Sequence, residues 1–350
     1  MREGWEYKKL GDSCVIEYGT RVVQKKDGGT KYPVYGGGGE TFRMDKYNRE
    51  NCLVVARFAM SRTCVRYVTG KFFLNDSGLS INAGKELLQS YLNHHILHLN
   101  DDIYNLGKGA AQRNLDVNSF RNLIITIPPL STQLSIVSEL DKINELIRLK
   151  KEQLKDYDNL AQSIFYEMFG DPAVNDKNWK VMKLGEICRN CDNLRKPITA
   201  SDRIPGSIPY YGASGIVDYV EDYIFSSDYL LVSEDGANLL ARTTPIAFSI
   251  SGKTWVNNHA HVLEFKDSET QLYVEYLINS VDISNYITGA VQPKLNQAKL
   301  NVFPIPLPPH SLQQLFAQRI ELIEQQKAEI QSTIADLETL LASRMQYWFD

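Results

Sequence analysis

The feature that most constrains this chain is a stretch of almost forty residues, Ser131 to Gly170, whose apolar side chains follow a four-three alternation. That 3.5-residue spacing is the period of a left-handed coiled-coil seam, so it predicts a long helix that packs lengthwise against another helix. Residues 311–350 repeat the alternation and are the predicted partner. The predicted seam residues are Ile136, Leu140, Ile143, Ile147, Leu154, Ile164, Phe316, Ile320, Ile323, Ile330, Ile334, Leu337 and Leu341.

The start of each predicted helix has the same local sequence. Two prolines precede each start, Pro128-Pro129 in one case and Pro308-Pro309 in the other. Proline ends the preceding strand, and Ser131 and Ser311 are predicted to cap the helices.

The second half of the chain repeats the first half. Trp5 and Lys9-Leu10-Gly11 return as Trp179 and Lys183-Leu184-Gly185, and the loop 109–112 returns as 289–292. Short β-branched runs alternate with glycine-rich turns and helix-like spacing in each half, which indicates mixed α and β structure. We therefore expect an α+β fold of two similar mixed α/β domains, separated by a pair of long antiparallel coiled-coil helices and related by a pseudo-two-fold repeat. The expected divisions are 1–130, 131–170, 171–310 and 311–350.

Composition limits the class of protein. The chain is 43% hydrophobic and 23% charged, as in globular domains. It contains neither an apolar run long enough for a membrane span nor an apolar signal-peptide core, so we expect a cytoplasmic protein without a membrane partner. The net charge is −4, yet residues 1–75 hold 14 Lys or Arg against 8 Asp or Glu. A positive surface in this region would suit nucleic acid.

Several polar residues have the chemistry needed to contact DNA bases. Arg57, Arg62 and Arg66 lie around two predicted strands, and Asn75 and Asp76 follow soon after. Arginine binds guanine through two hydrogen bonds, asparagine and glutamine bind adenine, and carboxylates accept from cytosine. The candidate DNA-binding residues are Arg57, Arg62, Arg66, Asn75, Asp76, Lys108, Gln112, Arg113, Tyr211, Ser214, Glu234, Asp235, Asn238, Arg242, Asn257, Asn258, His259, Gln292 and Lys294. The alternative is that many of them are salt-bridged surface residues.

The repeat divides these candidates into two kinds. Gln112 and Gln292 are alike in both halves, which favours shared backbone contacts or a loop-stabilising hydrogen bond. Arg57 and Glu234 differ at comparable places, so such positions could let the two halves recognise different sequences.

No catalytic or metal-binding set is evident. The sequence lacks a phosphate-binding loop, an Asn-Pro-Pro-aromatic run and a convincing pair of nuclease carboxylates. Cys188 and Cys191 form a lone pair of cysteines, whereas structural zinc needs four ligands. His94, His95 and His98 on a predicted helix are interpreted as ordinary surface or core histidines. His259 and His261 alternate along a strand and point to opposite faces, which leaves DNA contact or packing as alternatives for them.

The whole chain resembles the specificity subunit of type I restriction-modification enzymes. The resemblance rests on the repeated Trp and Lys-Leu-Gly openings, on the Gly-x-x-x-Gln loops, and on the segments 127–133 and 307–313. It implies two target-recognition domains that each bind one half of a bipartite double-stranded DNA site. It also implies helices that dock two methyltransferase subunits and, in the full complex, restriction and translocase subunits.

The resemblance further implies that this chain is non-catalytic and holds no cofactor. Its partner subunits would use S-adenosylmethionine to methylate adenine, and ATP with Mg²⁺ for restriction. Two alternatives remain open: a coiled-coil adaptor without sequence-specific DNA binding, and a DNA-modifying enzyme with a cryptic site.

Overall fold

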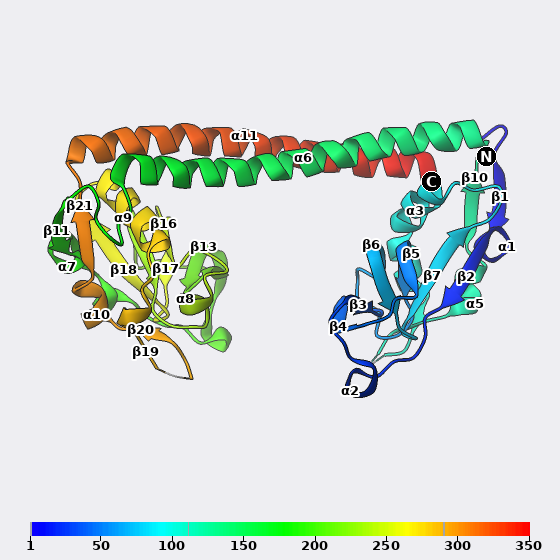
Figure 1. Cartoon of the computed structure of the whole chain (residues 1–350), viewed down its shortest axis with the longest axis horizontal. Coiled ribbons are helices and arrows are strands. Elements are labelled where there is room, and N and C mark those ends of the chain that lie inside the picture. The colour runs from blue at the N-terminus through cyan, green and yellow to red at the C-terminus, as the bar shows by residue number, and fades with distance from the viewer. Residues whose placement is uncertain (1, 111, 290) are drawn as a thin grey trace. The chain divides into compact units, whose positions relative to one another are not determined.

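The computed structural model describes residues 2–110, 112–289 and 291–350. The chain divides into two compact units. Unit 1 extends to Lys151 and also includes Gln331–Asp350, and unit 2 is Glu152–Ile330. Two long helices, α6 (Leu130–Phe169) and α11 (His310–Phe349), each contribute one half to unit 1 and the other half to unit 2 (Figure 1). The helices are therefore shared between the units, whereas the sequence-based division treats each helix as a separate segment.

Among the described residues, unit 1 is built on a six-stranded sheet of order β2-β7-β5-β6-β3-β4. All neighbours in this sheet are antiparallel except β3 and β6, which are parallel. Its strands are β2 (Cys14–Tyr18), β3 (Tyr32–Tyr35), β4 (Glu40–Met44), β5 (Arg49–Ala56), β6 (Val65–Leu74) and β7 (Gly78–Ala83). Two short antiparallel ladders complete the strands of unit 1: β1 (Glu6–Lys9) with β10 (Ile124–Ile127), and β8 (Gly107–Lys108) with β9 (Asn114–Leu115).

Short helices connect the strands of unit 1. They are α1 (Leu10–Ser13), α2 (Gln24–Asp27), α3 (Gln89–His98), α4 (Asn100–Asn105) and α5 (Val117–Arg121). Asp116 fixes the start of α5, because its carboxylate accepts hydrogen bonds from the backbone of Asn118 and Ser119.

Unit 2 repeats this plan with two smaller sheets, of order β12-β18-β15-β16 and β14-β13-β17. Their strands are β12 (Cys188–Asn190), β13 (Pro205–Gly212), β14 (Gly215–Val220), β15 (Tyr229–Ser233), β16 (Ala247–Ile250), β17 (Trp255–Val256) and β18 (Ala260–Phe265). Two short ladders again complete the strands: β11 (Lys180–Lys183) with β21 (Pro304–Leu307), and β19 (Ile287–Thr288) with β20 (Lys294–Leu295).

The helices of unit 2 are also mostly short. The α-helices are α7 (Leu184–Ile187), α8 (Asn238–Ala241), α9 (Ser268–Ser280) and α10 (Gln297–Asn301), and the 3₁₀ turns are η1 (Asp192–Leu194), η2 (Ala200–Asp202) and η3 (Ser284–Tyr286). In Figure 1, α9 lies beside the long helices, whereas the β19–β20 hairpin lies at the opposite end of unit 2. No described helix is both long and apolar enough to span a bilayer.

The main difference between the two units is a broken strand. In unit 1, β6 runs without interruption and its last residues pair with β3 in parallel, Val34 beside Phe73. In unit 2, the corresponding strand is divided into β16 and β17, and Tyr210 of β13 pairs with Trp255 in parallel. The pairing partners are therefore the same in both units. The predicted duplication of a mixed α/β domain is confirmed.

The two long helices pack antiparallel inside each unit. In unit 1 the start of α6, including Ile136 and Leu140, shares a core with the end of α11, including Leu341 and Phe349. In unit 2 the end of α6 shares a core with the start of α11, including Phe316. The predicted seam residues Ile136, Leu140, Ile143, Ile147, Phe316, Ile320, Ile323, Ile330 and Ile334 are buried, and Leu154, Ile164, Leu337 and Leu341 are partly buried.

Of these thirteen seam residues, nine are thus buried and the other four are partly buried. Near the end of each helix the four-three alternation falls on Met168 and Trp348, and both are partly buried against the cores. The structure also buries Phe169, which is 2% exposed, and Phe349, which is 5% exposed. A four-residue step, such as Phe165 to Phe169, lets the end of the helix contact the adjoining domain as well as the partner helix: the Phe169 ring lies 4.8 Å from Tyr273 of α9 and 5.1 Å from Phe316 of α11.

An equivalent tyrosine contacts the terminal phenylalanine of the long helix in each unit. The Phe349 ring lies 5.5 Å from Tyr91 of α3, and the Phe169 ring lies 4.8 Å from Tyr273 of α9. Each tyrosine is fully buried and donates its hydroxyl proton to a carbonyl of the adjoining short ladder, Thr126 or Pro306. These contacts join each long helix to its domain.

The prediction that Ser131 and Ser311 cap the long helices is wrong. The helices begin one residue earlier, at Leu130 and His310, because the Pro129 and Pro309 carbonyls already accept the first backbone hydrogen bonds. The glutamines two residues after these serines, Gln133 and Gln313, are buried instead. Gln133 donates to the carbonyls of Pro128 and Glu86, both at 2.8 Å, and Gln313 donates to Pro308 at the same distance.

Candidate nucleic-acid interface

Segments that are far apart in the sequence meet at one end of the unit 1 sheet. The backbone of Arg57, just after β5, accepts a hydrogen bond from Leu115 of β9 at 2.9 Å and donates one to Ser77 at 2.8 Å. The turn before β7 and the β8–β9 hairpin therefore lie beside the end of β5. Many of the predicted DNA-binding residues of unit 1 belong to these three segments.

Unit 2 has the same arrangement around Glu234. Its carbonyl accepts from Leu295 of β20 at 2.8 Å, and its N–H donates to His259 at 2.8 Å. Arg57 and Glu234 thus have equivalent backbone positions, and so do Ser77 and His259. The two units place different side chains on one shared frame.

Two asparagines form part of that frame. The side-chain oxygen of Asn75 accepts from the backbone of Ser77 at 2.9 Å, and that of Asn257 accepts from His259 at 2.8 Å. Their backbone N–H groups donate to Tyr35 and Tyr211, respectively. Such bonds between a side chain and the backbone two residues later stabilise turns. Asn75 and Asn257 therefore shape the turn, with their amide NH₂ groups as the remaining polar atoms.

The arginines of unit 1 lie against aromatic rings. The Arg57 guanidinium is 4.9 Å from the Tyr18 ring and 4.4 Å from the Phe58 ring. Arg62 and Arg113 both lie over Tyr104, at 4.9 and 4.6 Å. Arg66, the fourth arginine here, donates to the carbonyls of Gly37 and Thr63 at 3.0 and 3.1 Å. Among the described residues, none of these four arginines forms an ion pair with a carboxylate.

The hairpin loops carry the two predicted glutamines. Gln112 and Gln292 are exposed. Gly109 and Gly289 have φ values of +113° and +88°, and a Cβ on either would lie 2.3–2.4 Å from the carbonyl of the glutamine three residues later. Glycine is therefore required at the start of both loops. The predicted loop motif also includes Ala111 and Ala290, which lie outside the described residues.

Other candidates in and near these segments differ in the exposure of their side chains and in their partners. Lys108 is exposed and pairs with Asp116, and that hydrogen bond holds the pKa of Asp116 at about 2. Asp76 is half-buried, and its carbonyl accepts from Arg57. Ser214 and Asn258 are exposed.

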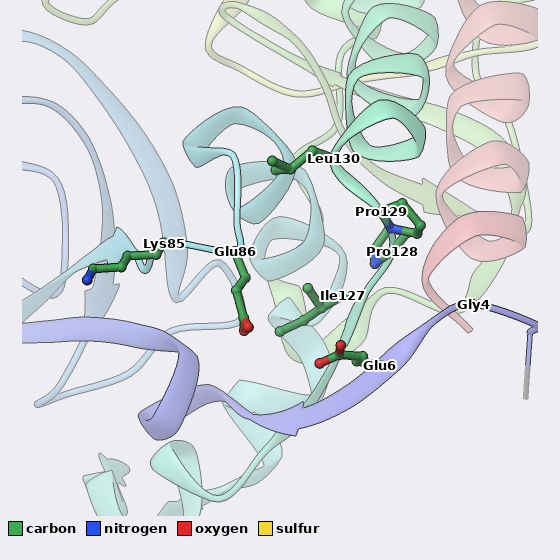
Figure 2. Close-up of a pocket in the computed structure, with 8 residues that line it drawn as sticks. All are labelled: Gly4, Glu6, Lys85, Glu86, Ile127, Pro128, Pro129 and Leu130. Carbon is green, nitrogen blue, oxygen red and sulfur yellow. The ribbon is translucent and has the colours of Figure 1, made fainter.

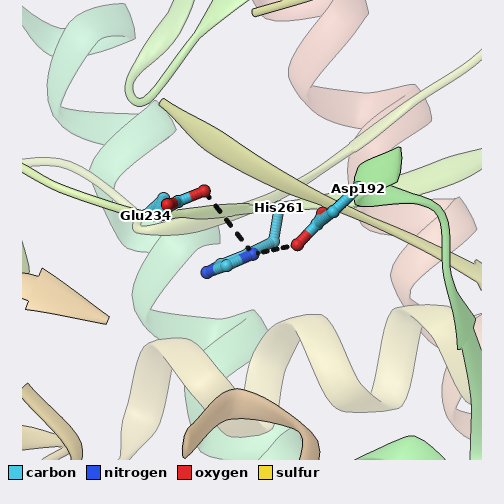
Figure 3. Close-up of side chains that lie close together, drawn as sticks. All are labelled: Asp192, Glu234 and His261. Carbon is cyan, nitrogen blue, oxygen red and sulfur yellow. Dashed lines mark hydrogen bonds and ion pairs between the residues drawn. The ribbon is translucent and has the colours of Figure 1, made fainter. Parts of the chain in front are cut away.

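In unit 2 the charges near the end of β15 neutralise one another. Glu234 lies 2.6 Å from Arg195, 3.0 Å from Lys294 and 3.8 Å from His261. His261 in turn lies 2.6 Å from Asp192 (Figure 3). Burial alone would raise the pKa of both carboxyls, but the hydrogen bonds from these cations lower it below the usual range.

His261 holds the centre of this cluster. Its Nδ1 faces Asp192 and its Nε2 faces the Leu295 carbonyl at 2.7 Å, and both partners are acceptors. The ring therefore links Asp192 to the backbone of β20. Asp192, Glu234 and His261 are close enough together to bind a metal, but a cation there would compete with Arg195 and Lys294 for the same oxygens. The cluster is an ion network rather than a metal site.

The remaining candidates of unit 2 are mostly held by internal bonds. His259 lies 2.9 Å from Asp235. Asn238 bonds to Thr243 and Thr244 in the loop after α8. Arg242 donates to the carbonyls of Ile278 and Val281 at 3.2 and 2.8 Å, which satisfies the end of α9. These contacts position the loops around the interface.

The cysteines and histidines interpreted as structural have such partners. The Cys188 and Cys191 thiols face the carbonyls of Leu184 and Arg189, and burial raises the pKa of each. On α3, the buried His95 ring stacks on Phe349 at 4.6 Å. His94 and His98 pair with Asp141 and Asp350, both at 2.7 Å.

A separate hollow lies where α6 begins (Figure 2). It is lined by Gly4, Glu6, Lys85, Glu86 and residues 127–130. Lys8 bonds to Glu6 and Glu86 at 2.7 and 2.6 Å, so ion pairs join the first strand to the segment before α3. This hollow contains none of the predicted DNA-binding residues.

Sequence reasoning missed the partners that organise the interface. Tyr18, Phe58 and Tyr104 beside the arginines, and Arg195 and Asp192 beside Glu234 and His261, were not predicted. Apart from the contact of Arg57 with the adjacent Phe58, these contacts join segments that only the folded sheet brings together, so no spacing rule links the residues. The duplicated pattern of the two halves was the one available signal, since it identified Arg57 and Glu234 as comparable positions.

Known proteins resemble this chain in sequence and in fold. A family model described as type I restriction modification DNA specificity domain matches residues 2–156 and again residues 176–338. A Haemophilus influenzae protein described as a type I restriction enzyme specificity subunit is 37% identical over 139 residues, which is 40% of this chain. The matched region spans 35% of that relative's length.

Two solved structures cover 99% of this chain. One is the S subunit of a type I restriction-modification system from M. genitalium, with a TM-score of 0.58 and 16% identity over 96% of that chain. The other is a chain solved to explain complex assembly and conformational transition of the type I R-M system, with a TM-score of 0.56 and 18% identity over 97% of that chain. At these identities the likeness concerns the fold alone.

Proposed function

Because this chain belongs to the family of type I restriction-modification DNA specificity domains, we propose that it selects the DNA site for such a system. Each unit binds one half of a bipartite double-stranded target. The observation that carries this proposal is the equivalence of Arg57 and Glu234, two different side chains on the same backbone position. One frame used twice with different contacts suits the recognition of two different half-sites.

Recognition on this proposal takes place in the major groove, where each base pair presents a distinct pattern of donors and acceptors. The segments at the end of each sheet supply groups of this kind: guanidinium in unit 1, and amide, imidazole and carboxylate in unit 2. The exposed Gln112, Gln292 and Lys108 are placed to contact the DNA backbone or to support the loops. Backbone contacts fix the position of a protein on DNA without selecting its sequence.

The catalytic steps belong to partners on this proposal. The long helices dock two methyltransferase subunits, which use S-adenosylmethionine to methylate adenine within the selected site. Restriction and translocase subunits, with ATP and Mg²⁺, act in the full complex. The target adenine must leave the base stack before it can be methylated, so the specificity chain contributes by holding the partner at the correct base. This role requires no catalytic residue in the chain itself.

A domain exchange within the chain tests the proposal. Residues 6–127 are replaced by residues 180–307, so that both positions carry the domain of unit 2 and the long helices remain unchanged. Methylated adenines are then mapped in genomic DNA from cells that express either chain together with the complete system. We expect the unit 1 half-site to be replaced by an inverted copy of the unit 2 half-site, because each domain recognises its own half.

The original chain is the matched control for both half-sites. A change in both halves at once contradicts the assignment of one unit to one half. Methylation that is equally distributed with and without either chain favours an adaptor without sequence preference.

A further inference from the structure

The side chain of Arg57 is unusually well positioned for a residue at the end of a strand. Its guanidinium lies over both the Tyr18 and the Phe58 ring, 4.9 and 4.4 Å from the ring centres. It also donates from Nη1 to the Asp76 carbonyl at 3.3 Å. Contacts on several sides restrict the rotamers of this half-buried side chain, so little conformational entropy remains to be lost when a ligand binds.

Most of the hydrogen-bonding capacity of Arg57 is unused. A guanidinium carries five N–H donors in a planar fork, and the Asp76 carbonyl takes one of them. No carboxylate pairs with Arg57 among the described residues. An arginine that is held in place but lacks an acidic partner retains its charge and its fork for a ligand that offers two adjacent acceptors.

The equivalent position in unit 2 is closed. Glu234 is 9% exposed, and its carboxylate oxygens are taken by Arg195 at 2.6 Å and Lys294 at 3.0 Å. Neither oxygen is available to a base without breaking an ion pair. The same frame therefore presents a donor fork in unit 1 and no free group in unit 2.

We propose that Arg57 is a specificity-determining residue that binds a guanine in the half-site of unit 1, through paired hydrogen bonds to O6 and N7. The inference rests on the proposed function and deepens it by assigning a base class to one residue. Guanine offers two adjacent acceptors in the major groove, which match the fork of arginine. Unit 2 obtains no base contact from the equivalent position, so the two half-sites differ there.

The neighbouring arginines provide the contrast that the test needs. Arg62 is exposed and lies over Tyr104, which Arg113 also contacts. Arg62 has no support comparable to the Tyr18, Phe58 and Asp76 contacts of Arg57. An exposed arginine of this kind serves DNA through its charge, which is a contact with phosphate rather than with a base.

The experiment uses the full-length chain, purified from cells that carry the complete system so that bound partner subunits are retained. The chain and its variants Arg57→Gln, Arg57→Lys and Arg62→Gln are incubated with a randomised duplex library at two salt concentrations, and the bound DNA is sequenced. Thermal unfolding of each variant verifies that it folds. Arg57→Lys keeps the charge and removes the fork, so it separates the two contributions.

We expect the original chain to select a guanine in one half-site. Both Arg57 variants lose that preference by about tenfold or more, while the other half-site is unchanged. Arg62→Gln keeps the preference, weakens binding to all sequences alike and lowers the slope of log affinity against log salt by about one.

The inference is overturned if folded Arg57→Gln and Arg57→Lys variants still select the same guanine, or if they weaken binding uniformly as Arg62→Gln does. In both cases the original chain still selects a bipartite sequence, so the proposed function survives. If the original complex selects no sequence, the proposed function fails and the inference fails with it.

Discussion

Unit 1 and unit 2 share a backbone arrangement but differ in the partners of the charged side chains at the end of the sheet. At the end of its sheet, unit 1 holds Arg57 and its neighbours against aromatic rings without acidic partners. At the same place, unit 2 buries Glu234 in a network with Arg195 and His261. The difference teaches that a duplicated domain can keep its frame while the same position changes from an arginine held against aromatic rings to a carboxylate buried in an ion network.

The largest expected effect concerns a contact that both units share, the buried phenylalanine at the end of a long helix beside its tyrosine. We expect Phe169→Ala to destabilise unit 2 and Phe349→Ala to destabilise unit 1, each by about 3–5 kcal/mol, because each removes a buried ring beside an equivalent tyrosine. Hydrogen exchange resolved along the chain measures the two units separately. Tyr347→Ala removes an exposed ring that contacts Arg2 and Arg344 and is the control, with an expected effect of at most about 1 kcal/mol. Equal loss of protection in both units from either variant would show that the units do not open independently.

The next test concerns how they differ. Glu234→Ala should lower the stability of unit 2 by about 3 kcal/mol, because it leaves Arg195 without its nearest carboxylate in a largely buried site. Arg57→Ala, at the equivalent position, should lower the stability of unit 1 by no more than about 1 kcal/mol, since only ring contacts and one carbonyl bond are lost. Hydrogen exchange at increasing denaturant concentration measures the stability of each unit in the two variants. Similar losses would contradict the assignment of support to one residue and ligand contact to the other.

The smallest expected difference is a response to mild acid. Burial lowers the pKa of His95 in unit 1 to about 3, so its contribution to stability is complete above pH 6.5 and is lost as the pH falls toward 3. At pH 5 the loss for unit 1 amounts to about 2 kcal/mol. Asp192 and Glu234 in unit 2 have lowered pKa values, so what they contribute is present above about pH 4 and persists at pH 5.

Hydrogen exchange at pH 7 and pH 5, corrected for the intrinsic rate, measures this response in each unit. His95→Leu should abolish the pH dependence of unit 1 between these values. The prediction is wrong if the two units lose the same stability, or if the variant still responds to pH as the original chain does.

Much of the architecture was predictable because its signals are local or repeated. The 3.5-residue stripe predicts two long helices, and 40-residue helices are present at both places. The duplicated openings and loops predict two similar domains. One prediction was wrong where the outcome depends on neighbours: Ser131 lies inside α6 because the Pro129 carbonyl starts the helix. The pattern also did not indicate that Phe169 is buried beside Tyr273.

The candidate interface shows the same limit. From the sequence, Arg57, Glu234 and Arg242 were one class of polar residue near strand ends. In the structure Arg57 lies over two aromatic rings, Glu234 is buried in an ion network and Arg242 bonds to carbonyls at the end of a helix. Most partners of these side chains come from distant segments, so the residues next to each one in the sequence do not indicate them.

The sequence by itself determined that this chain is a tandem repeat of a mixed α/β domain with a long helix after each copy, because hydrophobic period and repetition act along the chain. Only the tertiary structure decided which charged groups are paired inside the fold and which, among the described residues, have no partner of opposite charge. That choice depends on burial and on partners within a few ångströms, since desolvation and hydrogen bonding set the free energy of a charge.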